Sequence, residues 1–321
     1  MRSTNKTTTC VLGTLACAAA LPFTYTTARA DAPSHTDLLV NLDVANQYVT
    51  PRGMMVRNQG VTFQPLFLGF FNVYSGDSFI NSVTLNGGMW NDIGTKEVGI
   101  GTGGYNSKPS TPWTEIDPIG GIEIGFAKNF TLDVTATAFV EQIEAIGTSD
   151  HLDSKLSFND APYLHADGFG FHPYFEFWQE LSGKATDADL PAALNGNKPT
   201  ASSGKYYQPG SSYYIQTGVD PSYSFKDGVK LEVPVDFLLP SDRFYGEYYG
   251  KASTLGLWSV GGKVTVPLNF TPEGYGHWSF HVGVKYMYFE DVNLYNLNSY
   301  NSPGKPTRDT TLVYAGVSVF F

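Results

Sequence analysis

The feature that most constrains this chain is a strict alternation of apolar and polar residues, seen best in the segment 277–290 (HWSFHVGVKYMYFE). Successive side chains of a β-strand point to opposite faces. One face of this segment is therefore wholly apolar and carries aromatic residues at both ends, from Trp278 to Tyr288, while the other carries His281 and Lys285. Aromatic residues gather where a membrane meets water. The segment is thus typical of a strand that crosses a bilayer, whereas the apolar face of a soluble β-sandwich is a packed core that has no reason to end in aromatic residues.

The same alternation recurs along the chain and predicts an all-β fold. Eleven strands can be identified directly. A twelfth is predicted at 152–161, where the alternation is weak, because bacterial single-chain barrels have an even number of strands. The predicted strands span 38–49, 61–74, 78–90, 114–127, 130–145, 152–161, 168–182, 212–225, 229–239, 254–270, 277–290 and 309–321. They predict a transmembrane, antiparallel, up-and-down β-barrel of about twelve strands.

The links between the predicted strands alternate in length. The short links contain turn residues such as Asn, Asp and Gly and lie at 75–77, 128–129, 226–228 and 271–276. The long links are rich in Gly, Pro, Ser, Asn and Asp and lie at 50–60, 91–113, 184–211, 240–253 and 291–308. Short periplasmic turns opposite long extracellular loops are the known asymmetry of outer-membrane barrels.

The N-terminal segment has the three parts of a secretory signal. Two basic residues precede a short apolar core at 11–21, and a small-x-small cleavage motif ends at Ala30. The core is too short to cross a bilayer as a helix, which takes about 20 residues. We therefore predict a removable signal peptide at 1–30 and an outer-membrane β-barrel at 31–321. An uncleaved anchor or a buried helix is the alternative.

Composition excludes several classes of function. Both cysteines, Cys10 and Cys17, lie in the predicted signal, so the mature chain has no disulfide, thiolate nucleophile or Cys-zinc site. Without the three basic residues of the signal, 17 Lys and Arg face 30 Asp and Glu, which gives a net charge of −13. This charge argues against nucleic acid as a partner. No long apolar run follows the signal, which excludes a helical membrane protein.

The end of the chain supplies a more specific signal. In the last predicted strand every second residue is apolar, and these residues form one face that finishes on a terminal phenylalanine. An aromatic last residue on an alternating strand resembles the recognition signal of bacterial outer-membrane proteins, and we assign a C-terminal assembly signal to Val317, Val319 and Phe321. The alternative is a sheet strand that happens to end the chain.

Together, the signal, the twelve alternating strands and Phe321 resemble the outer-membrane porin-like proteins over the whole mature chain. The first loop and Asn91-Asp92, at the end of the third strand, resemble the porins called TorF-like. The resemblance implies a Gram-negative outer membrane, and as partners the lipid bilayer, lipopolysaccharide, the barrel assembly machinery and small polar solutes. It carries over no functional residue and gives no oligomeric state.

The predicted inward face is strongly acidic, with eleven acidic residues against three basic ones. Carboxylates in a pore attract cations and repel anions, so we predict a passive channel that prefers small polar or cationic solutes. The alternative is a narrow barrel that these side chains fill, since twelve strands lie between the filled and the open sizes. The predicted pore-lining residues are Asp43, Glu115, Asp117, Glu123, Asp133, Glu141, His172, Glu176, Glu180, Asp220, Lys230, Glu232, Asp236, Lys263, His281 and Lys285.

Aromatic residues form a second predicted feature of the interior. Tyr174, Trp178 and Tyr214 are expected to point inward, where rings of this kind stack against sugars or aromatic solutes. Anchoring at the membrane interface or packing in loops is the favoured alternative. We predict no cofactor and no metal site. His277 and His281 are about 13 Å apart along a strand, too far to share one ion.

Three further roles remain as alternatives. A closed barrel with a structural or adhesive role would use its long loops as the working surface. An outer-membrane lipid-modifying enzyme would need a lipid-facing His beside a Ser. His172 and His281 are both predicted to face inward, and no G-x-S-x-G motif occurs, so we predict no enzymatic activity. A soluble secreted sandwich is the last alternative.

Overall fold

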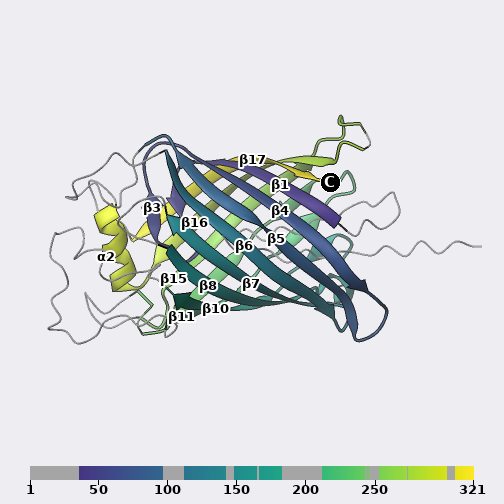
Figure 1. The fold of residues 1–321 in the computed structure, drawn as a ribbon, viewed down its shortest axis with the longest axis horizontal. Helices are drawn as coiled ribbons and strands as arrows, with labels where there is room; N and C mark the ends of the chain where they lie inside the picture. The colour runs from purple at the N-terminus through teal and green to yellow at the C-terminus, as the bar shows by residue number, and fades with distance from the viewer. Residues whose placement is uncertain are drawn as a thin grey trace, which may run out of the picture.

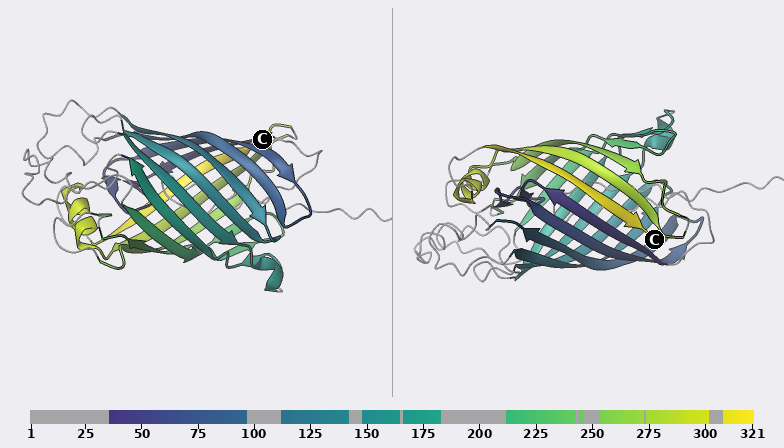
Figure 2. Two further views of the ribbon diagram at one scale, coloured as in Figure 1. Left: turned by 60° about the horizontal axis from the view of Figure 1, so that its bottom comes forward. Right: turned by 90° about the horizontal axis from the view of Figure 1, so that it is seen from above.

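The structure is a computed structural model, and it describes residues 36–96, 112–141, 148–164, 166–182, 212–242, 244–245, 253–272, 274–301 and 308–321. The predicted signal peptide and most of the longest loops lie outside these ranges. The described strands form one closed antiparallel β-barrel whose strands run tilted to its axis (Figures 1 and 2). The prediction of a transmembrane barrel of twelve strands is confirmed.

Each strand of the wall pairs with its neighbours in the sequence, and the ring closes where β1 pairs with β17. Full closure leaves no sheet edge in the bilayer, where an unpaired backbone group would be costly. The wall consists of β1 (Thr36–Ala45), β4 (Thr62–Ser75), β5 (Ile80–Gly94), β6 (Trp113–Phe126), β7 (Phe130–Glu141), β8 (Thr148–Phe158), β10 (Tyr174–Ser182), β11 (Tyr213–Val219), β14 (Val235–Pro240), β15 (Leu257–Pro267), β16 (His277–Phe289) and β17 (Asp309–Phe320).

Three short strands extend β10, β11 and β14 toward the short-turn end, each separated from its longer strand by a break in the ladder. They are β9 (Phe169–Gly170), β12 (Ser222–Ser224) and β13 (Lys230–Glu232), and a 3-10 turn at Ala161–Tyr163 precedes β9. Pro173, Pro221 and Pro234 lie at the three breaks, since proline has no N–H to donate to a ladder. The weakly predicted strand at 152–161 is real but begins earlier, as β8.

The outer face of the barrel is apolar and exposed, as the alternation predicts. On β16, Val282 and Val284 are 45% and 44% exposed, whereas His281, the residue before Val282, is 1% exposed. At the short-turn end a row of outward rings runs through Phe79, Phe126, Phe130, Phe158 and Tyr163, with centroids 4.8–5.8 Å apart. This row matches the aromatic girdle of a transmembrane barrel. Within the described residues, no helix has the length and apolarity to cross a membrane.

A charge on this outer face is expected to destabilise the barrel. Val282→Arg places a cation against lipid near mid-strand, and should lower the free energy of unfolding by about 2–4 kcal/mol. Urea unfolding in phospholipid vesicles measures the change. Asp167→Arg, on an exposed turn at the short-turn end, should leave the unfolding curve unchanged. Equal stability of the two variants would contradict a lipid-facing Val282.

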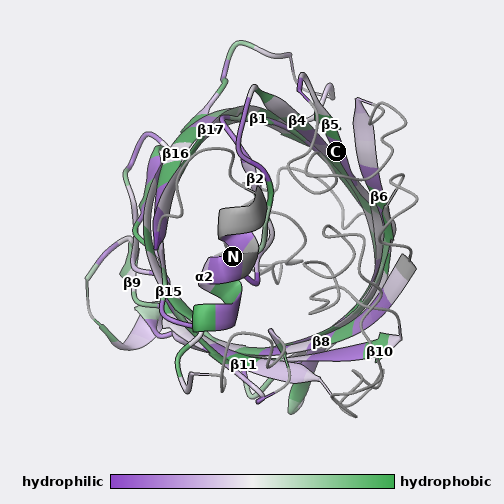
Figure 3. Ribbon diagram, turned by 90° about the vertical axis from the view of Figure 1, so that its left-hand side faces the viewer, coloured by the Kyte–Doolittle hydropathy of each residue, from purple (hydrophilic) through white to green (hydrophobic). Residues whose placement is uncertain are grey.

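Two of the predicted loops contain structure that the sequence did not predict. At the first, the predicted strand 38–49 ends early, as β1, and its last residues form β2 (Tyr48–Val49), which pairs with β3 (Met55–Arg57) of the loop as a small hairpin. In the last, α2 (Val292–Asn301) is helical, with Asp291 Oδ1 accepting from the N–H groups of Asn293 (2.7 Å) and Leu294 (3.1 Å). An Asp at this position is a good N-cap. Figure 3 looks along the barrel axis and shows α2 and β2 lying across the opening at the long-loop end.

Candidate functional site

The interior of the barrel is the candidate site, because the predicted pore-lining residues gather there. Asp43 is partly exposed, with 16% of its side-chain surface accessible, and His172 is half-buried at the short-turn rim. Glu141 ends β7, and its side chain lies outside the described part of the structure. The buried members are Glu115, Asp117, Glu123, Asp133, Glu176, Glu180, Asp220, Lys230, Glu232, Asp236, Lys263, His281 and Lys285.

The inward lysines of β13, β15 and β16 lie together and are held by ion pairs. Glu232 accepts from both Lys230 and Lys263 at 2.8 Å, and Lys285 lies 3.1 Å from Asp236. Alternate residues of adjacent strands place these groups on one face, so the ladder itself brings them within reach. These ion pairs give one side of the interior a compact and nearly neutral network, which we call the lysine wall.

The opposite side of the interior is anionic. Strands β6, β7, β8 and β10 carry seven buried carboxylates and a single lysine, Lys155, whose ammonium lies 4.2 Å from the ring centroid of Tyr174. Figure 3 shows β15 and β16 across the barrel from β6. We call this side the acidic wall, and its carboxylates are Glu115, Asp117, Glu123, Asp133, Asp153, Glu176 and Glu180.

The structure adds five charged residues to the predicted interior. Asp92 lies beyond the end of the predicted strand 78–90, and Asp153 and Lys155 lie in the strand whose alternation is weak. Arg52 and Arg57 belong to the first loop. The predicted excess of eleven acidic residues over three basic ones is therefore too large. The described interior holds twelve acidic residues against six basic ones. The acidic residues are Asp43, Asp92, Glu115, Asp117, Glu123, Asp133, Asp153, Glu176, Glu180, Asp220, Glu232 and Asp236; the basic residues are Arg52, Arg57, Lys155, Lys230, Lys263 and Lys285.

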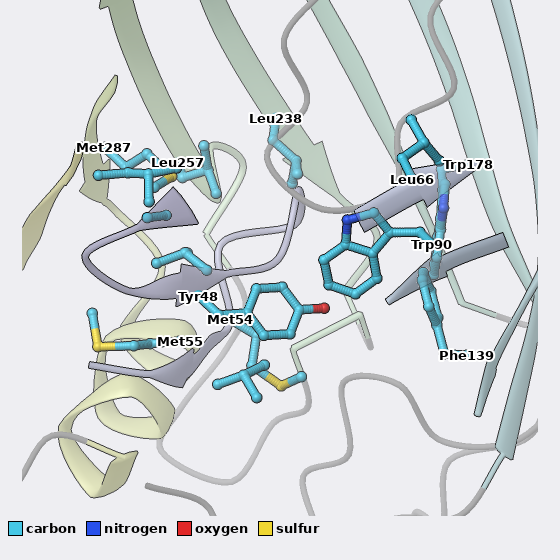
Figure 4. Packing of buried hydrophobic residues seen from close by; sticks show 14 of the residues in the cluster. Tyr48, Met54, Met55, Leu66, Trp90, Phe139, Trp178, Leu238, Leu257 and Met287 are labelled. Carbon is cyan, nitrogen blue, oxygen red and sulfur yellow. The ribbon is translucent and has the colours of Figure 1, made fainter. Parts of the chain in front are cut away.

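The hairpin of residues 46–60 enters the long-loop end of the barrel, and we call it the plug hairpin. Tyr48 is 1% exposed, and its ring lies beside that of Trp90 (Figure 4), with the two centroids 5.1 Å apart. The hydroxyl of Tyr48 donates to Glu115 at 2.8 Å. Burial, together with the neighbouring Glu115 carboxylate, raises the pKa of Tyr48 well above its usual value. The phenol therefore stays protonated and keeps donating to Glu115.

A buried ion pair fixes the other strand of the plug hairpin. Arg57 Nη2 lies 3.1 Å from Asp92 Oδ2, and neither side chain is exposed. Asp92 also accepts hydrogen bonds from the hydroxyls of Thr62 and Thr114. Hydrogen bonds of this kind offset the cost of burying both charges. Gly94 faces the same guanidinium, since an added Cβ would lie 1.8 Å from Arg57 Cζ.

The helix α2 and a loop residue hold the tip of the plug hairpin from outside. Asn298 donates to the carbonyl of Gly53 at 2.9 Å and accepts from the N–H of Met55 at 2.8 Å. Tyr245 donates to the carbonyl of Arg52 at 2.6 Å. Gly53 has φ +88°, a backbone conformation that favours glycine. The tip is thus a specific turn with partners from two distant parts of the chain.

The described residues show two histidine–serine pairs. His151 Nε2 lies 2.8 Å from Ser149 Oγ, and His172 Nε2 lies 3.1 Å from Ser222 Oγ. Ser149 and Ser222 are both buried and both lie on the inward face of their strands, so neither pair has the lipid-facing geometry that the enzyme alternative requires. The described residues hold no group of three or more His, Cys, Asp or Glu arranged for a metal ion.

The last residues of the chain close the barrel seam. Phe321 donates its N–H to the carbonyl of Leu38 at 2.9 Å and accepts from the N–H of Leu38 at 3.3 Å. Its side chain is 53% exposed. Val317 lies on the outward face as predicted, whereas Val319 is only 6% exposed, because the turn at Gly276 covers it. The assembly role of these residues stays a prediction.

Comparison with known proteins finds solved structures of similar fold but no family to which the chain can be assigned. No family model matches the chain, and no curated protein matches it. Among solved structures, the NanC porin is 9% identical with a TM-score of 0.41, covering 88% of this chain and 98% of the porin. The β domain of the Bordetella autotransporter BrkA is 8% identical with a TM-score of 0.43 (89% and 99%).

A third solved structure is an enzyme. The outer membrane phospholipase A from Escherichia coli is 13% identical with a TM-score of 0.39, covering 89% of this chain and 93% of the phospholipase. Likeness at this level concerns the fold and carries no information about a solute or an activity. The resemblance to TorF-like porins stays a prediction.

Proposed function

We propose that the protein is a passive, cation-preferring channel of the outer membrane for small polar solutes, and that the plug hairpin and α2 close it in the conformation described here. The observation that carries this proposal is the two-to-one excess of acidic over basic residues in the described interior of a closed transmembrane barrel. The proposed role is non-enzymatic and uses no cofactor. Export by the segment 1–30, recognition of Phe321 by the barrel assembly machinery and contact with lipopolysaccharide belong to the same proposal.

The charge distribution supports a role beyond filling the barrel. A buried carboxylate without a compensating cation is costly, and a purely structural interior would pair its charges, as the lysine wall does. The acidic wall instead concentrates carboxylates around one lysine. Asp133 Oδ2 and Asp153 Oδ1 are buried without a hydrogen-bond donor from the protein. Such oxygens suit hydrated or organic cations, and rings of acidic residues favour cations in pores.

Near-complete burial of the interior favours a second candidate, the closed structural barrel. Asp117 and Glu180 are 0% exposed, and Glu176 is 1% exposed, so these carboxylates are shielded from solvent in the described conformation. The two candidates differ in the role of the plug hairpin. For a channel the hairpin is a removable closure, whereas for a structural barrel the rest of the interior stays filled when the hairpin is absent.

Conductance in planar bilayers separates the two candidates. In the test variant a four-residue Gly-Ser turn replaces residues 46–61, which is feasible because Ala45 and Thr62 are cross-strand partners. We expect this variant to conduct at least tenfold more than the wild type. In a KCl gradient, the sign of its reversal potential should show that cations permeate more readily than anions. A silent variant, or one that prefers anions, would defeat the proposal.

Neutralising the acidic wall tests the origin of the preference. Glu123→Gln, Asp133→Asn and Asp153→Asn together, in the hairpin-replaced variant, should lower the cation-to-anion permeability ratio several-fold, because the field inside the barrel loses its negative charge. Asp167→Asn, on an exposed turn, serves as the matched control and should leave the ratio unchanged. An unchanged permeability ratio in the triple variant would show that these three carboxylates are not the origin of the cation preference.

A further inference from the structure

A continuous row of aromatic rings lines the inside of the long-loop end. Phe139, His151, Trp178 and Tyr214 come from four consecutive wall strands, β7, β8, β10 and β11, and Phe244 extends the row from the loop that follows the next wall strand, β14. Consecutive centroids are 4.3, 4.2, 5.0 and 5.1 Å apart. All four of these strand residues are at most 4% exposed. We call these five rings the aromatic row.

A guanidinium occupies this row. Arg52, at the tip of the plug hairpin, has its Cζ 4.4 Å from the ring centroid of Phe139 and 5.4 Å from that of Trp178. Both distances are within the range of an attractive cation–π contact, and the planar guanidinium stacks on rings better than an ammonium does. Arg52 itself is 3% exposed. The row therefore already binds a planar cation, supplied by the chain itself.

Carboxylates on the same strands lie next to the aromatic row. Asp153 is the cross-strand partner of Trp178, and Glu180 is the partner of His151. Glu176 accepts from the hydroxyl of Tyr214 at 3.3 Å. Aromatic faces bordered by carboxylates select cations over neutral molecules of the same shape.

We infer that the aromatic row is a binding site for planar organic cations of the guanidinium class, and that Arg52 occupies it as an internal ligand when the channel is closed. The inference deepens the proposed function, since it names the solute class of that channel. An incoming cation would compete with Arg52 for the same rings and carboxylates. Solute binding and displacement of the plug hairpin would then be one equilibrium.

Equilibrium binding in detergent micelles tests the site without reference to conductance. The probe is methylguanidinium chloride, titrated by calorimetry, and methylurea is its neutral isostere. Arg52→Ala should bind methylguanidinium at least tenfold more tightly than the wild type, because the internal ligand is gone, and should not bind methylurea. Adding Trp178→Leu to Arg52→Ala should weaken binding at least tenfold. The control is Arg308→Ala, which removes a different arginine that contacts an aromatic ring, that of Tyr295. This variant should bind methylguanidinium no better than the wild type.

Equal binding of methylurea, equal binding by the wild type, or the same gain in Arg308→Ala would overturn the inference. If Arg52→Ala does not fold, the wild type supplies the test. Methylguanidinium should speed chymotrypsin cleavage at Tyr48 and Met55, detected by mass spectrometry, and methylurea should not; equal rates would also overturn the inference. A hairpin-replaced barrel that binds the probe without conducting would instead contradict the proposed channel and leave the site intact.

Discussion

Replacing Asp92 by alanine is expected to release the plug hairpin from the barrel wall. Asp92 is 0% exposed and holds Arg57, which is 0% exposed as well, so the variant leaves a buried guanidinium without its counter-charge. Breaking a buried pair from one side costs about 3–5 kcal/mol. The hairpin can avoid this cost by leaving the barrel, where water solvates Arg57. A shift of about 3 kcal/mol raises the population of the displaced state roughly 100-fold.

Two measurements follow the release of the hairpin. Chymotrypsin should cut the variant at Tyr48 and Met55 at least tenfold faster than the wild type, and single-channel recordings should show at least tenfold more open time. Asp92→Asn keeps one of the two side-chain oxygens that accept from Thr62 and Thr114 and should give a smaller effect. Asp150→Ala removes an exposed carboxylate that bonds Ser182 at the same end of the barrel, and should change neither. Unchanged cleavage in Asp92→Ala would mean that the ion pair does not hold the hairpin.

Gly88→Val is expected to prevent assembly of the barrel. Gly88 pairs with Leu68 across β4 and β5, and a Cβ at Gly88 would lie 1.9 Å from the carbonyl oxygen of Phe67. That oxygen belongs to the backbone, so it cannot move without breaking the ladder between the two strands. In lipid each lost backbone hydrogen bond costs several kcal/mol, because no water replaces it. The variant should therefore yield less than a tenth of the folded barrel.

The amount of folded barrel is measured by the difference in gel mobility between unheated and heated samples after refolding into vesicles. Gly120→Val, on the neighbouring strand β6, is the matched control, because a Cβ there meets nothing within 4 Å and the position is exposed. It should refold as well as the wild type. If Gly88→Val refolded equally, the close approach of β4 and β5 would not be required for assembly.

The wall of the barrel could be predicted from the sequence because lipid and interior impose opposite demands on alternate residues. A strand such as 277–289 must place Val282 and Val284 toward lipid and His281 and Lys285 away from it, and period-two alternation records this choice directly. The same reasoning found the acidic excess of the interior. It missed Lys155 and Asp153, because the alternation of β8 is weak, with polar residues on both faces.

The sequence by itself determined the closed barrel, the inward and outward assignment of its strands and the sign of the interior charge, since each depends on the local periodicity of the chain. Only the tertiary structure decided that the first loop and the last one turn inward and meet. Their contacts join Arg57 to Asp92 and Gly53 to Asn298, residues 35 and 245 positions apart. The plug hairpin carries apolar residues that are buried in the structure, Tyr48, Val49, Met54, Met55 and Val56, but a short loop has the same composition whether it packs against other loops or inside the barrel. Which of the two it does depends on the partners that the closed wall brings to it.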